Sequence, residues 1–305
     1  MGTTWSLRFD NPHMLPLDTV RGTIEVALAH VVAQMSHWQA DSDLSRYNDA
    51  AAGAVHALAP GFGAVLACAL HWAKASGGAL DPTVGPLVAL WGFGPQAAGD
   101  VHLPAPEALR AAHAACGWQR LPFDAAAGTL RQPGGVTLDF SGIAKGFAVD
   151  HVVEGLRVLG LKGLLLEIGG EVRAVGRRPD GASWTVQIAA PEGDGTAPPA
   201  VVALADLAVA TSGDRWHRRE HAGRRWSHTI DPRTGVPVSH ALASVTVLHA
   251  ECMQADALAT VLTVLGPAQG LAFARTHDIA ALFFERKADG LQASASPAWM
   301  ERLSA

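Results

Sequence analysis

Residues 138–146 have the sequence Leu-Asp-Phe-Ser-Gly-Ile-Ala-Lys-Gly, and they separate a strand pattern from a helix pattern. The apolar spacing predicts a strand over residues 136–140 and a helix over residues 141–159 whose first turn is small and polar. Strand patterns follow at Leu164–Ile168 and Glu171–Arg177, joined by a glycine-rich turn. This part of the chain therefore predicts a helix followed by two strands.

The rest of the chain continues the mixture of helices and strands. Arms of one hairpin are predicted at Ala208–Ser212 and Arg225–Ile230, with Gly223 near its tip. Further helices are predicted at 17–35, from 62 to the Gly77-Gly78 pair, at 105–116, 255–265 and 268–276, a Pro- and Gly-rich loop at 81–95, and strands at 121–123, 129–132, 184–190, 201–204, 243–248 and 280–285. Because strands and helices do not alternate regularly, the predicted class is α+β, a mixed α/β arrangement. No shift in composition marks a boundary, so we expect one domain over residues 1–305.

The composition excludes several classes of protein. The chain has 305 residues, of which 49% are hydrophobic, and a net charge of −5. A chain of this length and apolar content forms a real core, which excludes disorder and collagen-like repeats. The acidic balance argues against nucleic-acid binding, which uses a basic surface. No uncharged apolar run reaches 18 residues, so we expect no transmembrane segment.

The cysteines and the N-terminus bear on the compartment. Cys68, Cys116 and Cys252 form no Cys-x-x-Cys pair, and we expect them to be small buried residues. Residues 1–6 have neither the basic start nor the apolar segment of a signal peptide. The sequence as written therefore predicts a cytoplasmic protein. A leader removed before residue 1 would instead predict a periplasmic or lipoprotein-anchored protein.

Asp256 and Thr260 are four residues apart on a predicted helix, so their oxygens project side by side. A carboxylate and a hydroxyl suit a hard cation such as Mg²⁺, which retains water and binds substrate phosphates. The alternative is that Asp256 only complements the helix dipole near the start of the helix.

Asp139 and Lys145 flank the predicted strand-to-helix junction. Small residues at a helix N-terminus expose backbone N–H groups, and a lysine there adds a positive charge, so the junction favours an anionic phosphate. A plain surface lysine is the alternative. The Gly169-Gly170 pair would let a ligand approach the backbone closely, although a β-bulge explains it nearly as well.

Two histidine motifs have competing interpretations. His228 precedes the turn Asp-Pro-Arg-Thr-Gly at residues 231–235 and is a candidate general base or a hydrogen-bonded turn histidine. His217 and His221 match the zinc-binding pattern His-x-x-Glu-His, which needs a helix. Strand patterns on both sides of residues 217–221 favour a solvated, charged hairpin arm instead.

Eight segments in chain order carry a family resemblance. They are residues 1–6, the stretch 35–48 with Asp-Ser-Asp-Leu-Ser-Arg at 41–46, Ala-Leu-Asp-Pro-Thr-Val-Gly-Pro-Leu at 79–87 with Leu-Trp-Gly-Phe-Gly at 90–94, residues 138–146, Glu-Ile-Gly-Gly-Glu at 167–171, Ala-Thr-Ser-Gly-Asp at 210–214, Ser-His-Thr-Ile-Asp-Pro-Arg-Thr-Gly at 227–235, and Cys-Met-Gln-Ala-Asp-Ala-Leu-Ala-Thr at 252–260. In this order they resemble the ApbE family of FAD:protein FMN transferases, and the resemblance runs from Met1 to about Gly266.

The resemblance implies a fold and a reaction. The fold would be T-fold-like, with two similar halves and FAD bound between them. The reaction would use Mg²⁺, split the FAD pyrophosphate, link FMN through a phosphoester to a threonine of an acceptor protein, and release AMP. The implied acceptor is a subunit of a respiratory membrane complex, with its threonine in a Ser-Gly-Ala-Thr-like motif.

The resemblance also implies a role for individual residues. His228 would deprotonate the acceptor threonine, and Lys145 would hold the pyrophosphate. Mg²⁺ would be bound by Asp256, Thr260 and the Gly142 carbonyl; FAD would be contacted by Met1, Trp38, Ala79, Leu80, Asp81, Asp139 and Ile230; Gly169, Gly170, Ser212, Gly213 and Asp214 would line the binding cleft. Two positions depart from the family pattern: Trp38 replaces a common tyrosine, and Gly142 replaces a common alanine or threonine.

Three alternative functions remain open from the sequence. A FAD pyrophosphatase would use the same metal site and release free FMN and AMP. A FAD-binding protein without turnover would bind the dinucleotide only. A zinc peptidase would require zinc at His217 and His221.

Overall fold

A computed structural model describes all residues of the chain except 1, 96–102, 190–199, 214–217, 222 and 305. The chain divides into two compact units, each made of separate segments. Unit 1 comprises residues 1–30, 143–215 and 241–305, and unit 2 comprises residues 31–142 and 216–240. The expected single domain over residues 1–305 stays a prediction.

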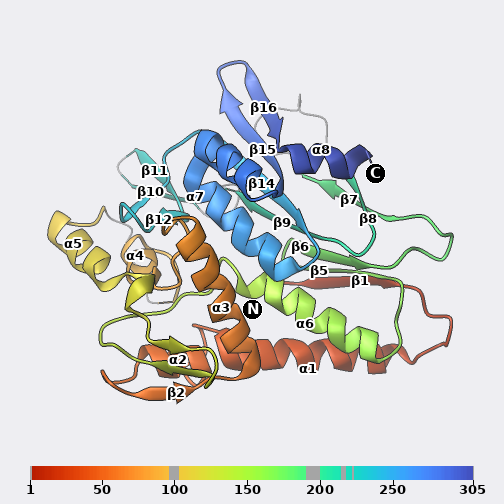
Figure 1. The fold of residues 1–305 in the computed structure, drawn as a ribbon, viewed down its shortest axis with the longest axis horizontal. Helices are drawn as coiled ribbons and strands as arrows, with labels where there is room; N and C mark the ends of the chain where they lie inside the picture. Colours follow the sequence, from red (N-terminus) through yellow and green to blue (C-terminus); the bar gives the residue numbers. More distant parts are fainter. Residues whose placement is uncertain (1, 96–102, 190–199, 214–217, 222, 305) are drawn as a thin grey trace. The chain divides into compact units, whose positions relative to one another are not determined.

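Unit 1 is built on a seven-stranded sheet whose neighbouring strands are antiparallel (Figure 1). In spatial order its strands are β1 (Trp5–Phe9), β5 (Leu164–Ile168), β6 (Glu171–Val175), β9 (Ala208–Gly213), β14 (Leu242–His249), β15 (Ala280–Lys287) and β16 (Gly290–Ala295). The two strands predicted after residue 163 are β5 and β6, which pair antiparallel.

The two faces of this sheet pack against different elements. Along β15, Leu282 and Phe284 join a core cluster with the hairpin of β7 (Trp184–Ile188) and β8 (Ala200–Leu204) and with α8 (Pro297–Ser304). Phe283 points the other way, since its ring lies next to Gly270 of a helix on the opposite face. The alternation of side chains along a strand explains this division, because successive residues face opposite sides of a sheet.

Two helices cover much of the opposite face of the sheet. They are α6 (Ala144–Val158) and α7 (Cys252–Thr276), which pack against each other and against the sheet. Gly266 has a φ of 73° and Pro267 follows it, so α7 is kinked there. The two helices predicted at 255–265 and 268–276 meet at this kink, and that prediction is confirmed.

Among the described residues one helix, α7, is long and apolar enough to cross a membrane by length and composition. More than half of its most apolar stretch is buried inside the protein. This burial is typical of a core helix.

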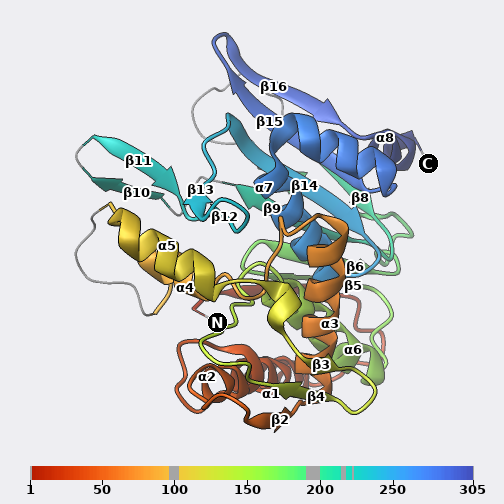
Figure 2. The same ribbon diagram turned by 60° about the vertical axis from the view of Figure 1, so that its left-hand side comes forward.

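Unit 2 consists of helices and small two- and three-stranded sheets (Figure 2). Its elements are α2 (Asp43–Asn48), β2 (Val55–Ala57), α3 (Pro60–Ala75), α4 (Gly85–Leu90), α5 (Pro106–Ala115), η1 (Trp118–Arg120), β3 (Phe123–Asp124), β4 (Thr129–Arg131), β10 (Arg218–His221), β11 (Arg224–Ser227), β12 (Ile230–Asp231) and β13 (Val236–Pro237). The helix α1 (Leu17–Met35) begins in unit 1 and ends in unit 2. The α+β class is confirmed, as are the helices predicted at 17–35 and 105–116.

Three local predictions were wrong. Residues 136–140 form no strand, because Leu138 bonds to the Asn48 side chain and the Asp139 N–H bonds to the Pro82 carbonyl oxygen. Residues 208–212 do not pair with 225–230: β9 pairs with β6 and β14 in the large sheet, whereas β11 pairs with β10. The loop predicted at 81–95 contains α4, which starts at Gly85-Pro86, and proline is well tolerated in the first turn of a helix.

Candidate active site

The first turn of α6 meets α7 in unit 1. The Gly146 N–H donates a 2.9 Å hydrogen bond to Asp256 Oδ2, which joins two motifs that lie 110 residues apart. A side chain at position 146 would not fit, since a Cβ there would lie 2.8 Å from Asp256 Cβ and closer still to the Cys252 carbonyl oxygen. Glycine is therefore required for the close approach of the two helices.

Lys145 joins the same cluster through a carboxylate on the sheet. Its Nζ donates a hydrogen bond to Glu171 Oε1, and the Glu171 side chain is 2% exposed. Glu171 is the first residue of β6 and follows the turn at Gly169 and Gly170, which have φ values of 62° and 103°. The turn is held by the Gly170 N–H, which donates to the Glu167 carboxylate at 2.8 Å. The double glycine thus serves the turn that places Glu171.

The cluster is electrostatically strained. Burial, with the nearby charge of Asp256, raises the pKa of Glu171 to about 8. Burial also raises the pKa of Asp256 above its ordinary value, although Lys145 and the Gly146 N–H oppose that change. The two carboxylates raise the pKa of Lys145 above its usual range against the effect of its own desolvation. Lys145 therefore stays positively charged, and a cation or proton is favoured beside the carboxylates.

A second ion pair holds the first turn of α7 in place. Asp150 of α6 accepts hydrogen bonds from the Cys252 and Met253 N–H groups at 2.9 and 2.8 Å. Arg173 of β6 lies 2.6 Å from the same carboxylate. These contacts satisfy backbone donors that an isolated helix start would leave unpaired, so they fix the turn that precedes Asp256.

Cys252 is buried in this region. We expected all three cysteines to be buried, and this holds for Cys68 and Cys252, whereas Cys116 is only partly buried. Burial raises the pKa of the Cys252 thiol well above its usual range, and neighbouring carboxylates add to the effect. A thiol that stays protonated is a poor nucleophile. Cys252 is therefore a packing residue.

Other predicted residues of unit 1 lie on α7 and β9. Thr260 is four residues after Asp256 on α7, as predicted. Ser212 and Gly213 end β9, where they pair with Val245 and Ser244 of β14. Met1, predicted to contact FAD, and Asp214, predicted to line the cleft, lie outside the described residues.

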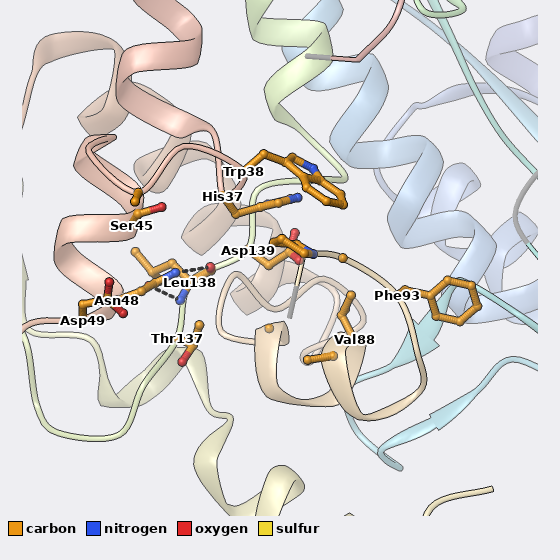
Figure 3. Close-up of a pocket in the computed structure, with 15 residues that line it drawn as sticks. His37, Trp38, Ser45, Asn48, Asp49, Val88, Phe93, Thr137, Leu138 and Asp139 are labelled. Carbon is orange, nitrogen blue, oxygen red and sulfur yellow. Dashed lines mark hydrogen bonds between the residues drawn. The ribbon is translucent and has the colours of Figure 1, made fainter. Parts of the chain in front are cut away.

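Unit 2 contains a cavity of about 220 Å³ (Figure 3). The exposed indole of Trp38 and the Asp139 side chain both line it, as do apolar groups of Val88 and Phe93. The remaining lining residues are His37, Ala40, Ser45, Asn48, Asp49, Gly85, Ala89, Gly94, Pro95, Thr137 and Leu138. A flat aromatic ring beside a mixed polar and apolar wall suits a planar heterocycle.

The wall formed by residues 137–139 is held by a distant amide. Asn48 accepts from the Leu138 N–H at 2.7 Å and donates to the Leu138 carbonyl oxygen at 3.0 Å. Asp139 accepts from the Ser141 N–H at 2.7 Å, which starts the turn toward α6. The extended conformation of this wall thus comes from side chains, and sequence reasoning missed Asn48 as the residue that sets it.

The loop at residues 79–81 is buried and internally bonded. Ala79 and Leu80 both donate backbone N–H groups to the Ser76 hydroxyl. The Asp81 carboxylate accepts from the N–H and hydroxyl of Thr83 at 2.8 and 2.6 Å, and from the Trp118 N–H at 3.1 Å. Burial raises the pKa of Asp81 despite these bonds. Its carboxylate therefore has a clear structural role in this loop.

His228 follows β11, and its ring lies edge-on to Phe93 with centroids 6.2 Å apart. Ile230 is buried in a cluster with Leu87, Trp91 and Trp226. The predicted turn at 231–235 is formed, and the Arg233 guanidinium donates to Asp231 at 2.8 Å. A cavity-lining aromatic ring thus supports the candidate base.

The described part of the zinc-like motif is a strand. Residues 218–221 form β10, and His221 pairs with Arg224 of β11. His217 lies outside the described residues. The geometry that puts two histidines on one face of a helix is missing in β10, so the hairpin interpretation is confirmed for residues 218–221.

The predicted site residues therefore fall into two groups. Unit 1 holds Lys145, Gly169, Gly170, Ser212, Gly213, Asp256 and Thr260, and unit 2 holds Trp38, Ala79, Leu80, Asp81, Asp139, Gly142, His228 and Ile230. The chain passes from one unit to the other between Gly142 and Ile143. Within the described part of the chain, no group of three or more His, Cys, Asp or Glu side chains could hold a metal ion. A metal would thus need hydroxyl, backbone or substrate oxygens besides Asp256.

Comparisons with known proteins found a family model, curated relatives and solved structures that this chain resembles. The model of the ApbE family matches residues 1–283. The chain is 38% identical to an FAD:protein FMN transferase of Vibrio cholerae, over all of this chain and 91% of that protein. It is also 38% identical to an FAD:protein FMN transferase of Haemophilus influenzae, over 98% of this chain and 88% of that protein. The crystal structure of the Pseudomonas stutzeri flavinyl transferase ApbE, apo form, superposes with a TM-score of 0.91 at 37% identity, covering 100% of this chain and 95% of that one.

Proposed function

We infer that this chain, which belongs to the ApbE family, transfers FMN from FAD to a protein acceptor. The observation that carries this function is the Gly146–Asp256 hydrogen bond. It brings two family motifs together in one buried, charged cluster with Lys145. Phosphoryl transfer depends mainly on positioning and on neutralising negative charge, and Lys145 would supply a positive charge for this purpose.

The proposed reaction joins the FMN phosphate to a threonine. The threonine oxygen attacks the phosphorus atom of the FMN half of the pyrophosphate, and a new phosphoester bond forms. The bond from that phosphorus to the bridging oxygen breaks, and AMP leaves with the electron pair. His228 accepts the proton of the threonine hydroxyl as a general base. Phe93 supports the histidine ring during this step.

Asp256 has the chemistry of a Mg²⁺ ligand. Only its Oδ2 accepts a hydrogen bond from the described part of the chain, so Oδ1 remains for a cation. Its raised pKa reflects an environment in which burial disfavours an uncompensated negative charge. We propose that Asp256, Thr260 and the Gly142 carbonyl hold Mg²⁺, which would supply charge neutralisation to the pyrophosphate.

Lys145 supplies a second positive charge for the pyrophosphate. Its ammonium has three N–H donors, and one of them is used by Glu171. Within the described part of the chain the other two have no partner, and they can donate to phosphate oxygens. Lys145 therefore binds and orients the pyrophosphate, while Asp256 and Thr260 serve the metal.

The residues of unit 2 would bind the remainder of FAD. Trp38 is 71% exposed beside the cavity, so its indole is available to stack on a planar ring of the dinucleotide. Asp139 lines the same cavity and can accept hydrogen bonds from ring or ribose groups. Gly169, Gly170, Ser212 and Gly213 of unit 1 remain proposed cleft residues.

The acceptor and the compartment are also proposals. The acceptor we propose is a subunit of a respiratory membrane complex whose threonine lies in a Ser-Gly-Ala-Thr-like motif. The locations we propose to distinguish are the cytoplasm, the periplasm and a lipoprotein anchor at a membrane. Fractionating cells and assaying each compartment for FMN transfer distinguishes these locations.

A direct test uses a carrier protein with a fused Ser-Gly-Ala-Thr segment and a matched carrier that ends in Ser-Gly-Ala-Val. Incubation with the enzyme, FAD and Mg²⁺ should add the mass of FMN to the first carrier only. The His228→Ala variant should bind FAD but transfer FMN at least about a hundredfold more slowly. Equal labelling of both carriers would disprove transfer to threonine, and full activity of the variant would disprove the role of His228.

A further inference from the structure

Glu171 and Lys145 differ in how firmly the fold holds them. Glu171 begins β6, which lies between β5 and β9 in the large sheet, and its carboxylate is buried. Lys145 lies in the first turn of α6 on a flexible four-carbon stem, and its side chain is 37% exposed. Because the carboxylate is fixed and the stem is not, the hydrogen bond between them sets the position of the ammonium group.

Among the described residues, Glu171 is the one hydrogen-bond partner of Lys145 Nζ. A free lysine side chain samples many rotamers, and a ligand that binds it must first restrict them. A lysine that is already held meets the ligand with less loss of entropy, which is the advantage of preorganised charge. One N–H anchored to Glu171 leaves two N–H groups for an anion.

We propose that Glu171 is a positioning residue, which holds the Lys145 ammonium ready for the FAD pyrophosphate. This inference rests on the proposed function and adds a residue that acts on the substrate only through Lys145. The role assigned to Glu171 is that of a hydrogen-bond acceptor fixed in space.

The buried carboxylate of Glu171 is an unfavourable feature for the stability of the fold. Glu171 is buried near a second carboxylate, Asp256, and its Oε2 has no hydrogen-bond partner among the described groups. Replacing a whole buried ion pair with apolar residues of similar volume is often neutral or stabilising, whereas removing one partner alone is costly. The arrangement therefore favours a role in the chemistry of the site over a role in stability.

A double-mutant cycle on FAD affinity tests the proposal. The variants are Lys145→Met, Glu171→Leu and the two combined, and the dissociation constant for FAD is measured by flavin fluorescence without Mg²⁺ or acceptor. We expect Lys145→Met to weaken binding about tenfold and Glu171→Leu about threefold to fivefold. The double variant should bind like Lys145→Met alone, because Glu171 has no lysine left to position.

Two further variants keep the test decisive. Glu171→Gln retains an acceptor oxygen and should restore most of the affinity that Glu171→Leu loses. Melting temperatures are measured for every variant, and Glu171→Ala takes the place of Glu171→Leu if the latter does not fold. A loss of affinity that is the same with and without Lys145, or a Glu171→Gln variant as weak as Glu171→Leu, overturns the proposal.

The cycle is independent of the proposed reaction because it requires no turnover. Additive losses in a protein that still transfers FMN would reject the role of Glu171 alone. Coupled losses in a protein that forms no FMN adduct would support the positioning of Lys145 and reject the transferase function.

Discussion

The charged cluster of unit 1 and the cavity of unit 2 are built in different ways. In unit 1, Lys145, Glu171 and Asp256 come from two helices and a central strand. In unit 2, the cavity wall at 137–139 belongs to no strand or helix and is held by the Asn48 amide. The first site is fixed by regular elements that pack together, and the second by hydrogen bonds from a side chain to the backbone.

The difference follows from what each site would bind. A pyrophosphate needs charges placed in a buried, preorganised array, because an unpaired buried charge is costly. A planar ring needs a shaped wall and an exposed aromatic face, which loops provide. Substitutions in unit 1 should therefore affect fold and chemistry together, and those in unit 2 mainly FAD affinity.

The largest effect is expected from Asp256→Ala. This variant loses the proposed Mg²⁺ ligand and the acceptor for the Gly146 N–H, so FMN transfer should fall by at least about a hundredfold. The exposed Glu251, at the start of the same helix, gives a matched control, and Glu251→Ala should transfer FMN at the normal rate. A FAD-binding protein without turnover would show no change in either variant.

The second-largest effect is expected from Gly146→Ala, because the added Cβ would push α6 away from α7. We expect the free energy of unfolding to fall by about 1–3 kcal/mol, as for an overpacked core. Gly22→Ala in α1 is the control, since nothing lies within 4 Å of a Cβ there. That change should stabilise the protein by about 0.4–1 kcal/mol. Denaturant melts that show no loss for Gly146→Ala would contradict the close helix contact.

Asn48→Leu breaks both hydrogen bonds to Leu138 while keeping the side-chain size similar. Two lost hydrogen bonds predict a fall of about 1–3 kcal/mol in the free energy of unfolding. FAD should bind more weakly, whereas the chemistry of unit 1 should persist at saturating FAD. A fall in kcat without a rise in KM would show that the cavity wall does not contact FAD.

Trp38→Ala should alter binding but not stability, because most of the indole is exposed. Loss of stacking predicts about tenfold weaker FAD binding, and Trp38→Phe should recover part of it. Calorimetric titration with FAD measures both variants. An alanine variant that binds FAD as tightly as the parent would exclude a stacking role.

The smallest effect concerns pH. The folded-state pKa of Glu171 is raised to about 8 from an ordinary value of 4.5, so the stability that its protonated form contributes is fully present below the ordinary value and is lost as the pH rises to 8. Glu171→Gln removes this titration. The melting temperatures of the variant and the parent are compared without FAD or Mg²⁺. The variant's value minus the parent's should increase by a few degrees from pH 5 to pH 8. A difference that is constant with pH would show that the carboxylate is not strained.

The sequence predicted those parts of the fold that depend on neighbouring residues. The kink of α7 was predictable because Gly266 and Pro267 interrupt the helix locally. The wall at 137–139 was not, since its hydrogen bonds come from Asn48, 90 residues away. The pairing of β9 with β14 could likewise not be predicted, because the segment between these two strands contains a separate hairpin, formed by β10 and β11.

The site was predictable only through the order of its motifs. Lys145 and Asp256 each have a common structural explanation when taken alone, and the Gly146–Asp256 contact is not visible from spacing. Glu171 was overlooked as a site residue, although it follows two glycines at the start of a strand, because its partner Lys145 lies 26 residues earlier on another element. Long-range contacts between charged groups have no local signature in a single sequence.

The most direct test of the account is a balance of products in one reaction. The enzyme is incubated with FAD, Mg²⁺ and the carrier that ends in Ser-Gly-Ala-Thr, and AMP, free FMN and protein-bound FMN are measured together. We expect one bound FMN for each AMP and almost no free FMN. Free FMN equal to AMP would identify a pyrophosphatase, and the absence of AMP would contradict the proposed chemistry altogether.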